Sequence, residues 1–61
     1  MLAHGDIVRQ AHILEDLLGL GAEARAAQKA TEEKIAGHAE AAEDWRKIRE
    51  VLRQRKGAHE S

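Results

Sequence analysis

Hydrophobic residues recur at helical spacing in the segment 36–52, whose sequence is AGHAEAAEDWRKIREVL. Successive intervals of four, three and four residues place the members of this stripe along one face of a helix. They include the only aromatic residue of the chain, and they are Ala41, Trp45, Ile48 and Leu52. We therefore predict a helix over about 39–55 with a narrow packing face, followed by a frayed tail at 57–61.

A wider stripe lies near the N-terminus. Its hydrophobic arc spans about 160° of a helical wheel, which is more than one neighbouring helix requires. The pattern predicts a helix over about 6–18 that is buried between two or more neighbours. We predict that this helix ends at Gly19-Leu20-Gly21, because two glycines around a leucine are typical of a left-handed C-terminal cap with a hydrophobic contact just beyond it. The stripe consists of Ile7, Ala11, Leu14 and Leu18, with Ile13 and Leu17 beside it.

Alanines dominate the segment between these two stripes, for which we predict a helix over about 22–36. Two arrangements are open at its end. A single helix could continue from 22 to 56, because one glycine inside a helix costs only about 1 kcal/mol. The hydrophobic phase breaks at Gly37, however, and this favours an αα-hairpin. For the inner face of the helix we predict Ala24, Ala27, Thr31 and Ile35, and for the opposite side Ala22, Ala26 and Ala30.

The fold class that follows is all-α: one domain over 1–61, a three-helix unit completed by oligomerisation. Sixty-one residues bury a smaller fraction of their surface than a larger domain does. Twelve of the residues are alanine, which fills little volume, and there is no cysteine to form a stabilising disulfide bond. We therefore expect the protein to associate with itself, as a homodimer or higher oligomer, or to dock on a larger protein.

Charge is unevenly distributed, although the net charge is only −1. Residues 1–45 carry nine acidic and four basic residues, whereas residues 46–61 carry six basic and two acidic ones. This asymmetry favours antiparallel or head-to-tail docking and permits an anionic partner. A basic ridge at spacings of three, four and three residues runs beside the Trp45 face, and it consists of Arg46, Arg49, Arg53 and Lys56.

Little in the sequence indicates catalysis. There is one serine, one threonine, no cysteine and no glycine-rich phosphate loop, so we expect no enzyme, no cofactor and no small-molecule substrate. His12 and Glu15 share a helix face, but di-iron bundles use Glu-x-x-His on two helices, and here the order is reversed and occurs once. We expect no metal at the four histidines, which are His4, His12, His38 and His59.

No feature of the sequence indicates export or a membrane. The N-terminus lacks a basic region followed by a 7–15-residue apolar core. No apolar run approaches the roughly 20 residues that a spanning helix needs. We expect a cytoplasmic protein that binds no membrane.

The turn and the tryptophan together resemble a known pattern. Ala36-Gly37-His38, six further residues, Trp45 and then Ile48 fit A-G-[DH]-x6-W-x-x-I. This arrangement resembles a family of short, uncharacterised, all-helical alphaproteobacterial proteins, over about two-thirds of the chain. His38 stands where that family tends to have aspartate. The resemblance implies a small all-α fold and no assigned activity.

These observations predict a non-enzymatic helical interaction or assembly module. Its protein interface is expected on the first and third helices, at Ile7, Ala11, Leu14, Leu18, Trp45, Ile48 and Leu52. The alternative is a small regulator that binds nucleic acid through Arg46, Arg49, Arg53 and Lys56. The low net charge and the single aromatic residue argue against a strong nucleic-acid footprint.

Overall fold

The computed structural model describes the backbone of residues 3–60 and the side chains of residues 3–55. Within residues 3–60 it contains helices and no strand, which confirms the all-α prediction. None of the helices described is long and apolar enough to cross a membrane. In chain order the elements are α1 (His4–Leu18), the 3-10 turn η1 (Gly19–Gly21), α2 (Ala22–Ile35) and α3 (Ala39–Glu60).

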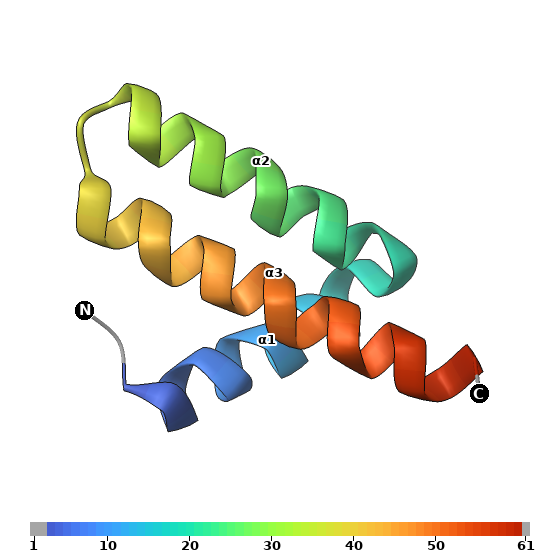
Figure 1. Ribbon diagram of the computed structural model, residues 1–61. Helices are drawn as coiled ribbons and strands as arrows, with labels where there is room; N and C mark the ends of the chain where they lie inside the picture. Colours follow the sequence, from blue (N-terminus) through green and yellow to red (C-terminus); the bar gives the residue numbers. More distant parts are fainter. Residues whose placement is uncertain (1–2, 61) are drawn as a thin grey trace.

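The helices α2 and α3 form an antiparallel hairpin, and α1 crosses beneath it (Figure 1). The hairpin turn is a Schellman cap around Gly37, whose φ of 85° is one that glycine adopts without strain. The N–H of Gly37 bonds to the carbonyl of Lys34, and the N–H of His38 bonds to that of Glu33. The alternative of one continuous helix from 22 to 56 is therefore wrong.

His38 closes this turn with its side chain as well as its backbone. Nδ1 of His38 lies 2.7 Å from Oε2 of Glu33. The backbone N–H of His38 donates to the carbonyl of the same residue. A Schellman cap often carries a hydrophobic contact between these two positions, and here a polar contact replaces it. The carbonyl of His38 then accepts the N–H of Ala42, at 2.9 Å, in the first turn of α3.

Side chains from all three helices meet in one small core. Leu14, Trp45 and Val51 pack against it and are partly buried. Three of its members are large, three are alanines, and all are less than a tenth exposed: Ile7 and Ala11 of α1, Ala22 and Ala26 of α2, and Ile48 and Leu52 of α3.

The predicted inner face of α2 is wrong. Ala22, Ala26 and Ala30 are buried, whereas Ala24, Thr31 and Ile35 are exposed. The physical reason is the small volume of alanine, which lets α2 approach its neighbours closely on that side. Ile35 is 81% exposed as a result.

The helix bounds differ from the predicted ones mainly at the ends of the chain. α1 begins two residues before the predicted position, at His4, and α2 ends one residue earlier, at Ile35. The backbone of α3 stays helical to Glu60, so the predicted frayed tail is wrong for residues 57–60, and Ser61 lies outside the described residues. Gly57 lowers helix propensity by about 1 kcal/mol but does not end α3.

Arg55 connects the far end of α3 to α1. It donates two hydrogen bonds to Glu15, from Nη2 to Oε1 at 2.8 Å and from Nε to Oε2 at 3.3 Å. Its Nη1 lies 3.1 Å from Nε2 of His12, and this nitrogen must accept, because a guanidinium only donates. The bond with Glu15 raises the pKa of Arg55, and the charges of Glu15 and Asp16 add to the rise, while desolvation opposes it.

We expect Arg55 and Glu15 to be energetically coupled. In a double-mutant cycle of Arg55→Gln and Glu15→Gln, the double variant should lose less stability than the sum of the two single ones. The pKa of Arg55 is higher in the folded chain than in the unfolded one. The contribution of Arg55 to the free energy of unfolding is therefore present at every pH below the ordinary arginine pKa and is lost only above it. The coupling measured by urea unfolding should thus be equal at about pH 7 and pH 10.

The exposed pair Arg46 and Glu43, three residues apart on α3, is the control. The same cycle there should give little coupling, because exposed ion pairs contribute between about 0 and 1 kcal/mol. Equal coupling for both pairs would contradict a specific link between α1 and α3.

Candidate interaction surfaces

Four of the seven residues predicted for the protein interface lie inside the single chain. Ile7 and Ala11 of α1 pack with Ile48 and Leu52 of α3, and none is more than 4% exposed. This corrects the prediction, because the stripes of the first and third helices cover one another without a partner.

Trp45 and Leu14 are also turned towards this core and are half-buried. Nζ of Lys29 lies 5.9 Å from the centre of the Trp45 ring, within the range of a cation–π contact. Glu32 and Glu33 lie 3.7 and 4.0 Å from the same ammonium group. Of the predicted interface, only Leu18 is exposed, and its exposed fraction is 46%.

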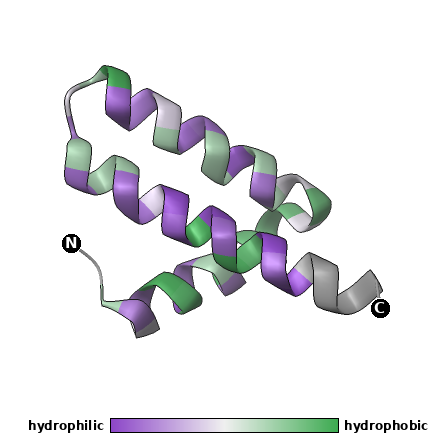
Figure 2. Ribbon diagram, viewed as in Figure 1, coloured by the Kyte–Doolittle hydropathy of each residue, from purple (hydrophilic) through white to green (hydrophobic). Residues whose placement is uncertain are grey.

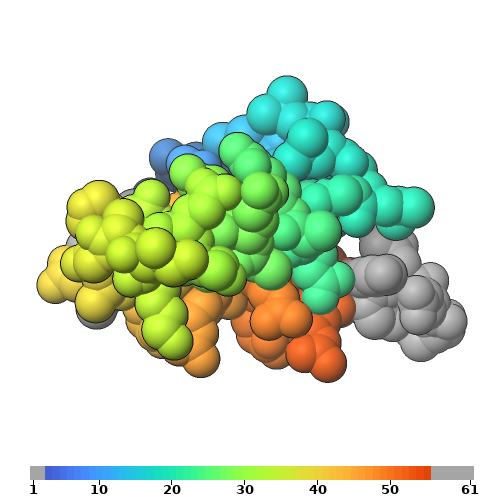
Figure 3. Space-filling view, turned by 90° about the horizontal axis from the view of Figure 1, so that it is seen from above, coloured from blue at the N-terminus to red at the C-terminus, as the bar shows by residue number. Residues whose placement is uncertain are grey.

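A different hydrophobic surface is exposed, and we call it the leucine patch. It lies where α1 runs into η1, a part of the molecule that protrudes from its body (cyan in Figure 3). The hydropathy colouring shows apolar residues in this connection between α1 and α2 (Figure 2). Ile13 and Leu17 stand one turn apart on α1. The patch consists of Ile13, Leu17, Leu18 and Leu20, which are 43%, 75%, 46% and 91% exposed.

The sequence held one signal for the leucine patch. The arc of the first helix was too wide for one neighbour, and in the structure only part of it is covered. The side that carries Ile7 and Ala11 faces the core, while the side that carries Ile13 and Leu17 does not. Leu20 is 91% exposed, so the predicted hydrophobic contact just beyond the glycine cap of the first helix is wrong.

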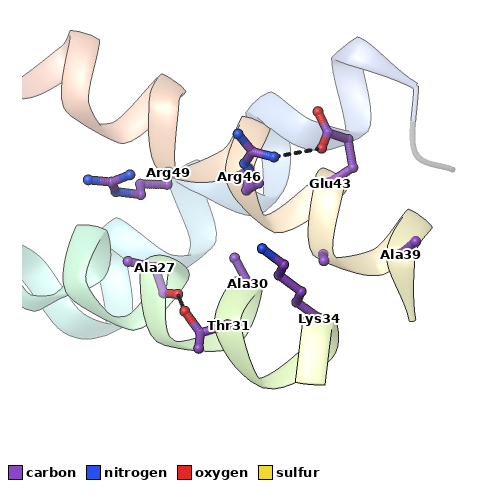
Figure 4. A pocket seen from close by; sticks show the side chains of 9 residues that line it. Ala27, Ala30, Thr31, Lys34, Ala39, Glu43, Arg46 and Arg49 are labelled. Atoms are coloured by element: carbon purple, nitrogen blue, oxygen red, sulfur yellow. Dashed lines mark hydrogen bonds and ion pairs between the residues drawn. The ribbon is translucent and has the colours of Figure 1, made fainter. Parts of the chain in front are cut away.

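The second surface is a groove of about 590 Å³ between α2 and α3. None of its lining residues belongs to the core cluster that includes α1, so the groove lies on another side of the hairpin. Figure 4 shows its two walls and Lys34, which extends from α2 towards α3. We call it the α2–α3 groove, and it is lined by Ala27, Ala30, Thr31 and Lys34 of α2 and by Ala39, Ala42, Glu43, Arg46 and Arg49 of α3.

Positive charge exceeds negative charge along the α2–α3 groove. Nη1 of Arg46 lies 3.3 Å from Oε2 of Glu43, so this pair is mutually neutralised. Lys34 and Arg49, on opposite walls, make no ion pair with any residue that the structure describes. Two cations are therefore available to an incoming group from two sides.

The predicted basic ridge is only partly assembled at this groove. Arg46 and Arg49 line it, Arg53 is exposed one turn further along α3, and the side chain of Lys56 lies outside the described residues. Lys34 was missed, because on its own helix it is an ordinary last-turn cation. Only the hairpin brings it opposite the arginines.

The described side chains do not assemble a metal centre: no group of three or more His, Cys, Asp or Glu residues converges among them. His12 and Glu15, which share a face of α1, both contact Arg55. His38 contacts Glu33, and the side chain of His59 lies outside the described residues.

No family model, no curated protein and no solved structure matches this chain. The resemblance to the short alphaproteobacterial proteins therefore stays a prediction from residues 36–48. Any functional proposal must therefore rest on the leucine patch and the α2–α3 groove, and not on a related protein.

Proposed function

We propose that this protein is a non-enzymatic helical interaction module that associates with itself through the leucine patch. The observation that carries the proposal is the exposure of four large hydrophobic side chains on one short connected segment. Single exposed leucines are ordinary on protein surfaces, whereas contiguous apolar patches mark sites of association. The cytoplasm remains the compartment that the sequence predicts for it.

The energetics of a small chain support this proposal. Burying one large apolar side chain contributes roughly 1.5–3 kcal/mol. Only Ile7, Ile48 and Leu52 among the large side chains described are buried in the core. The leucine patch has four large exposed side chains, one more than the core buries, although two of them are already more than half covered, so association would add hydrophobic burial comparable to that of the core.

We expect Leu17→Glu to abolish self-association without unfolding the chain. Leu17 is 75% exposed in the single chain, so glutamate there remains solvated, whereas in an interface it would be a buried charge. Sedimentation over a range of protein concentrations should show the wild type gaining mass while the variant stays a monomer.

Ile35→Glu is the matched control for this experiment. Ile35 is 81% exposed, close to the value for Leu17, but it lies at the end of α2 remote from the leucine patch, so its replacement by glutamate should leave the association unchanged. A wild type that stays a folded monomer with a cooperative melt would overturn the proposal. A loss of association in both variants would show that the effect of Leu17→Glu is not specific to the leucine patch, and the variant would then not support the proposal.

A second candidate function is nucleic-acid binding by the basic residues. The observation that favours it is the placement of Lys34 opposite Arg46 and Arg49 in the α2–α3 groove. Phosphate contacts of this kind weaken steeply as salt rises. We rank it second, because Arg46 is already paired with Glu43 and the net charge of the chain is −1.

A further inference from the structure

We infer that the self-association is head-to-tail: the leucine patch of one copy docks in the α2–α3 groove of the next. This inference rests on the proposed function and adds to it the surface that receives the patch. The two surfaces share no residue, so a docked pair still has one free leucine patch and one free groove.

The shape of the groove suits a helix. Four of its nine lining residues are alanines, distributed over both walls, and small side chains let another helix approach closely. Its α3 wall runs from Ala39 to Arg49, eleven residues whose ends lie about 15 Å apart along the helix. The outer side of α1, which carries Ile13 and Leu17, offers large side chains to fill a groove that α1 of the same chain leaves open.

Charge also matches between the two surfaces. Helix α1 presents Asp6 and Asp16 as exposed acids against a single arginine, Arg9, while Glu15 is already bonded to Arg55. Asp16 is next to Leu17 of the leucine patch, and Asp6 lies ten residues before Asp16, about 15 Å along the helix. Lys34 and Arg49 could therefore pair with Asp16 beside the docked leucines and with Asp6 further along the docked helix.

Symmetric arrangements use these surfaces less well. Two α2–α3 grooves facing one another would bring together Lys34 and Arg49 of both copies, and like charges in contact are unfavourable. Two leucine patches facing one another would bury the leucines but leave both groove cations without a carboxylate. A head-to-tail contact uses both surfaces and, unlike a two-fold one, generates rings or open chains.

The test is charge reversal in the groove, in the full-length chain. We expect Arg49→Glu to raise the protein concentration needed for half-association by about tenfold or more, because it places an acid where the acids of α1 dock. Lys47→Glu is the control: it changes the net charge equally, from an exposed position on α3 outside the groove. It should leave the association within about twofold of the wild type.

Mixing two variants then separates a head-to-tail contact from a symmetric one. Leu17→Glu has an intact groove and Arg49→Glu has an intact leucine patch, so each should be monomeric alone at a concentration where the wild type associates. An equimolar mixture should form a one-to-one heterodimer and nothing larger, because only one productive contact remains.

The outcomes distinguish this inference from the proposed function. If Leu17→Glu is monomeric but Arg49→Glu associates as the wild type does, self-association stands and the groove is not its receptor. That result overturns the inference, as does a mixture that stays monomeric. It would equally be overturned if Arg49→Glu lost binding to a short RNA duplex while self-association was unaffected, which would assign the groove to nucleic acid. A monomeric wild type would overturn both.

Discussion

Ile48→Ala is expected to remove most of the stability of the folded chain. Ile48 is the largest fully buried side chain among those described, 2% exposed at the centre of the core. Replacing a buried isoleucine by alanine costs about 2–5 kcal/mol, through lost burial and the cavity left behind. A domain of this length has a total stability of roughly 3–9 kcal/mol. Far-UV circular dichroism during urea unfolding should show a large fall in the midpoint or no cooperative transition at all.

Ile35→Ala provides the matched control, since the same atoms are removed from a side chain that is 81% exposed. Its effect should stay within about 0.5 kcal/mol. Ile48→Val, which removes one methyl group, should cost about 0.5–1.5 kcal/mol and keep the transition measurable. A similar loss at positions 35 and 48 would show that the core is not centred on Ile48.

The periodicity of the sequence was sufficient to predict both packing faces. Ile7 and Ala11, and Ile48 and Leu52, were grouped correctly as residues that must be buried. Periodicity alone could not say against what they pack, because a stripe looks the same whether its neighbour is in the same chain or another. The interface was therefore placed on residues that the chain buries by itself.

The middle helix shows a different limit of sequence reasoning. Alanines occur on several sides of α2, so its amphipathic signal is weak, and its only large hydrophobic side chain, Ile35, indicated the wrong face. Close approach of helix backbones decided the packing in favour of Ala22, Ala26 and Ala30. The groove could not be predicted for a related reason: Lys34 and Arg49 are fifteen residues apart in the sequence, and only the hairpin places them on the two walls of one groove.

The connection that carries the leucine patch depends on the backbone conformation of Gly19. We therefore expect Gly19→Ala to have the second largest effect on stability, after Ile48→Ala. Gly19 has φ 57° and ψ −125°, a combination that residues with a Cβ rarely adopt, whereas Gly21 in the same turn has φ −80° and ψ −8°, which any residue adopts. A Cβ at either position would meet no atom within 4 Å, so the two substitutions differ in backbone strain and not in crowding.

Gly19→Ala should therefore lower the free energy of unfolding by about 1–3 kcal/mol. Gly21→Ala should leave it unchanged or raise it by about 0.4–1 kcal/mol, because alanine restricts the unfolded chain. Urea unfolding of both variants, kept below the concentration at which the wild type associates, gives the comparison. Equal effects of the same sign would contradict the conformation of the turn. If the two substitutions change the free energy of unfolding in opposite directions, backbone strain at Gly19 is the cause of the loss, and the reduced flexibility of the unfolded chain is not. That strain lies in the connection between α1 and α2, where Leu20 is exposed to solvent.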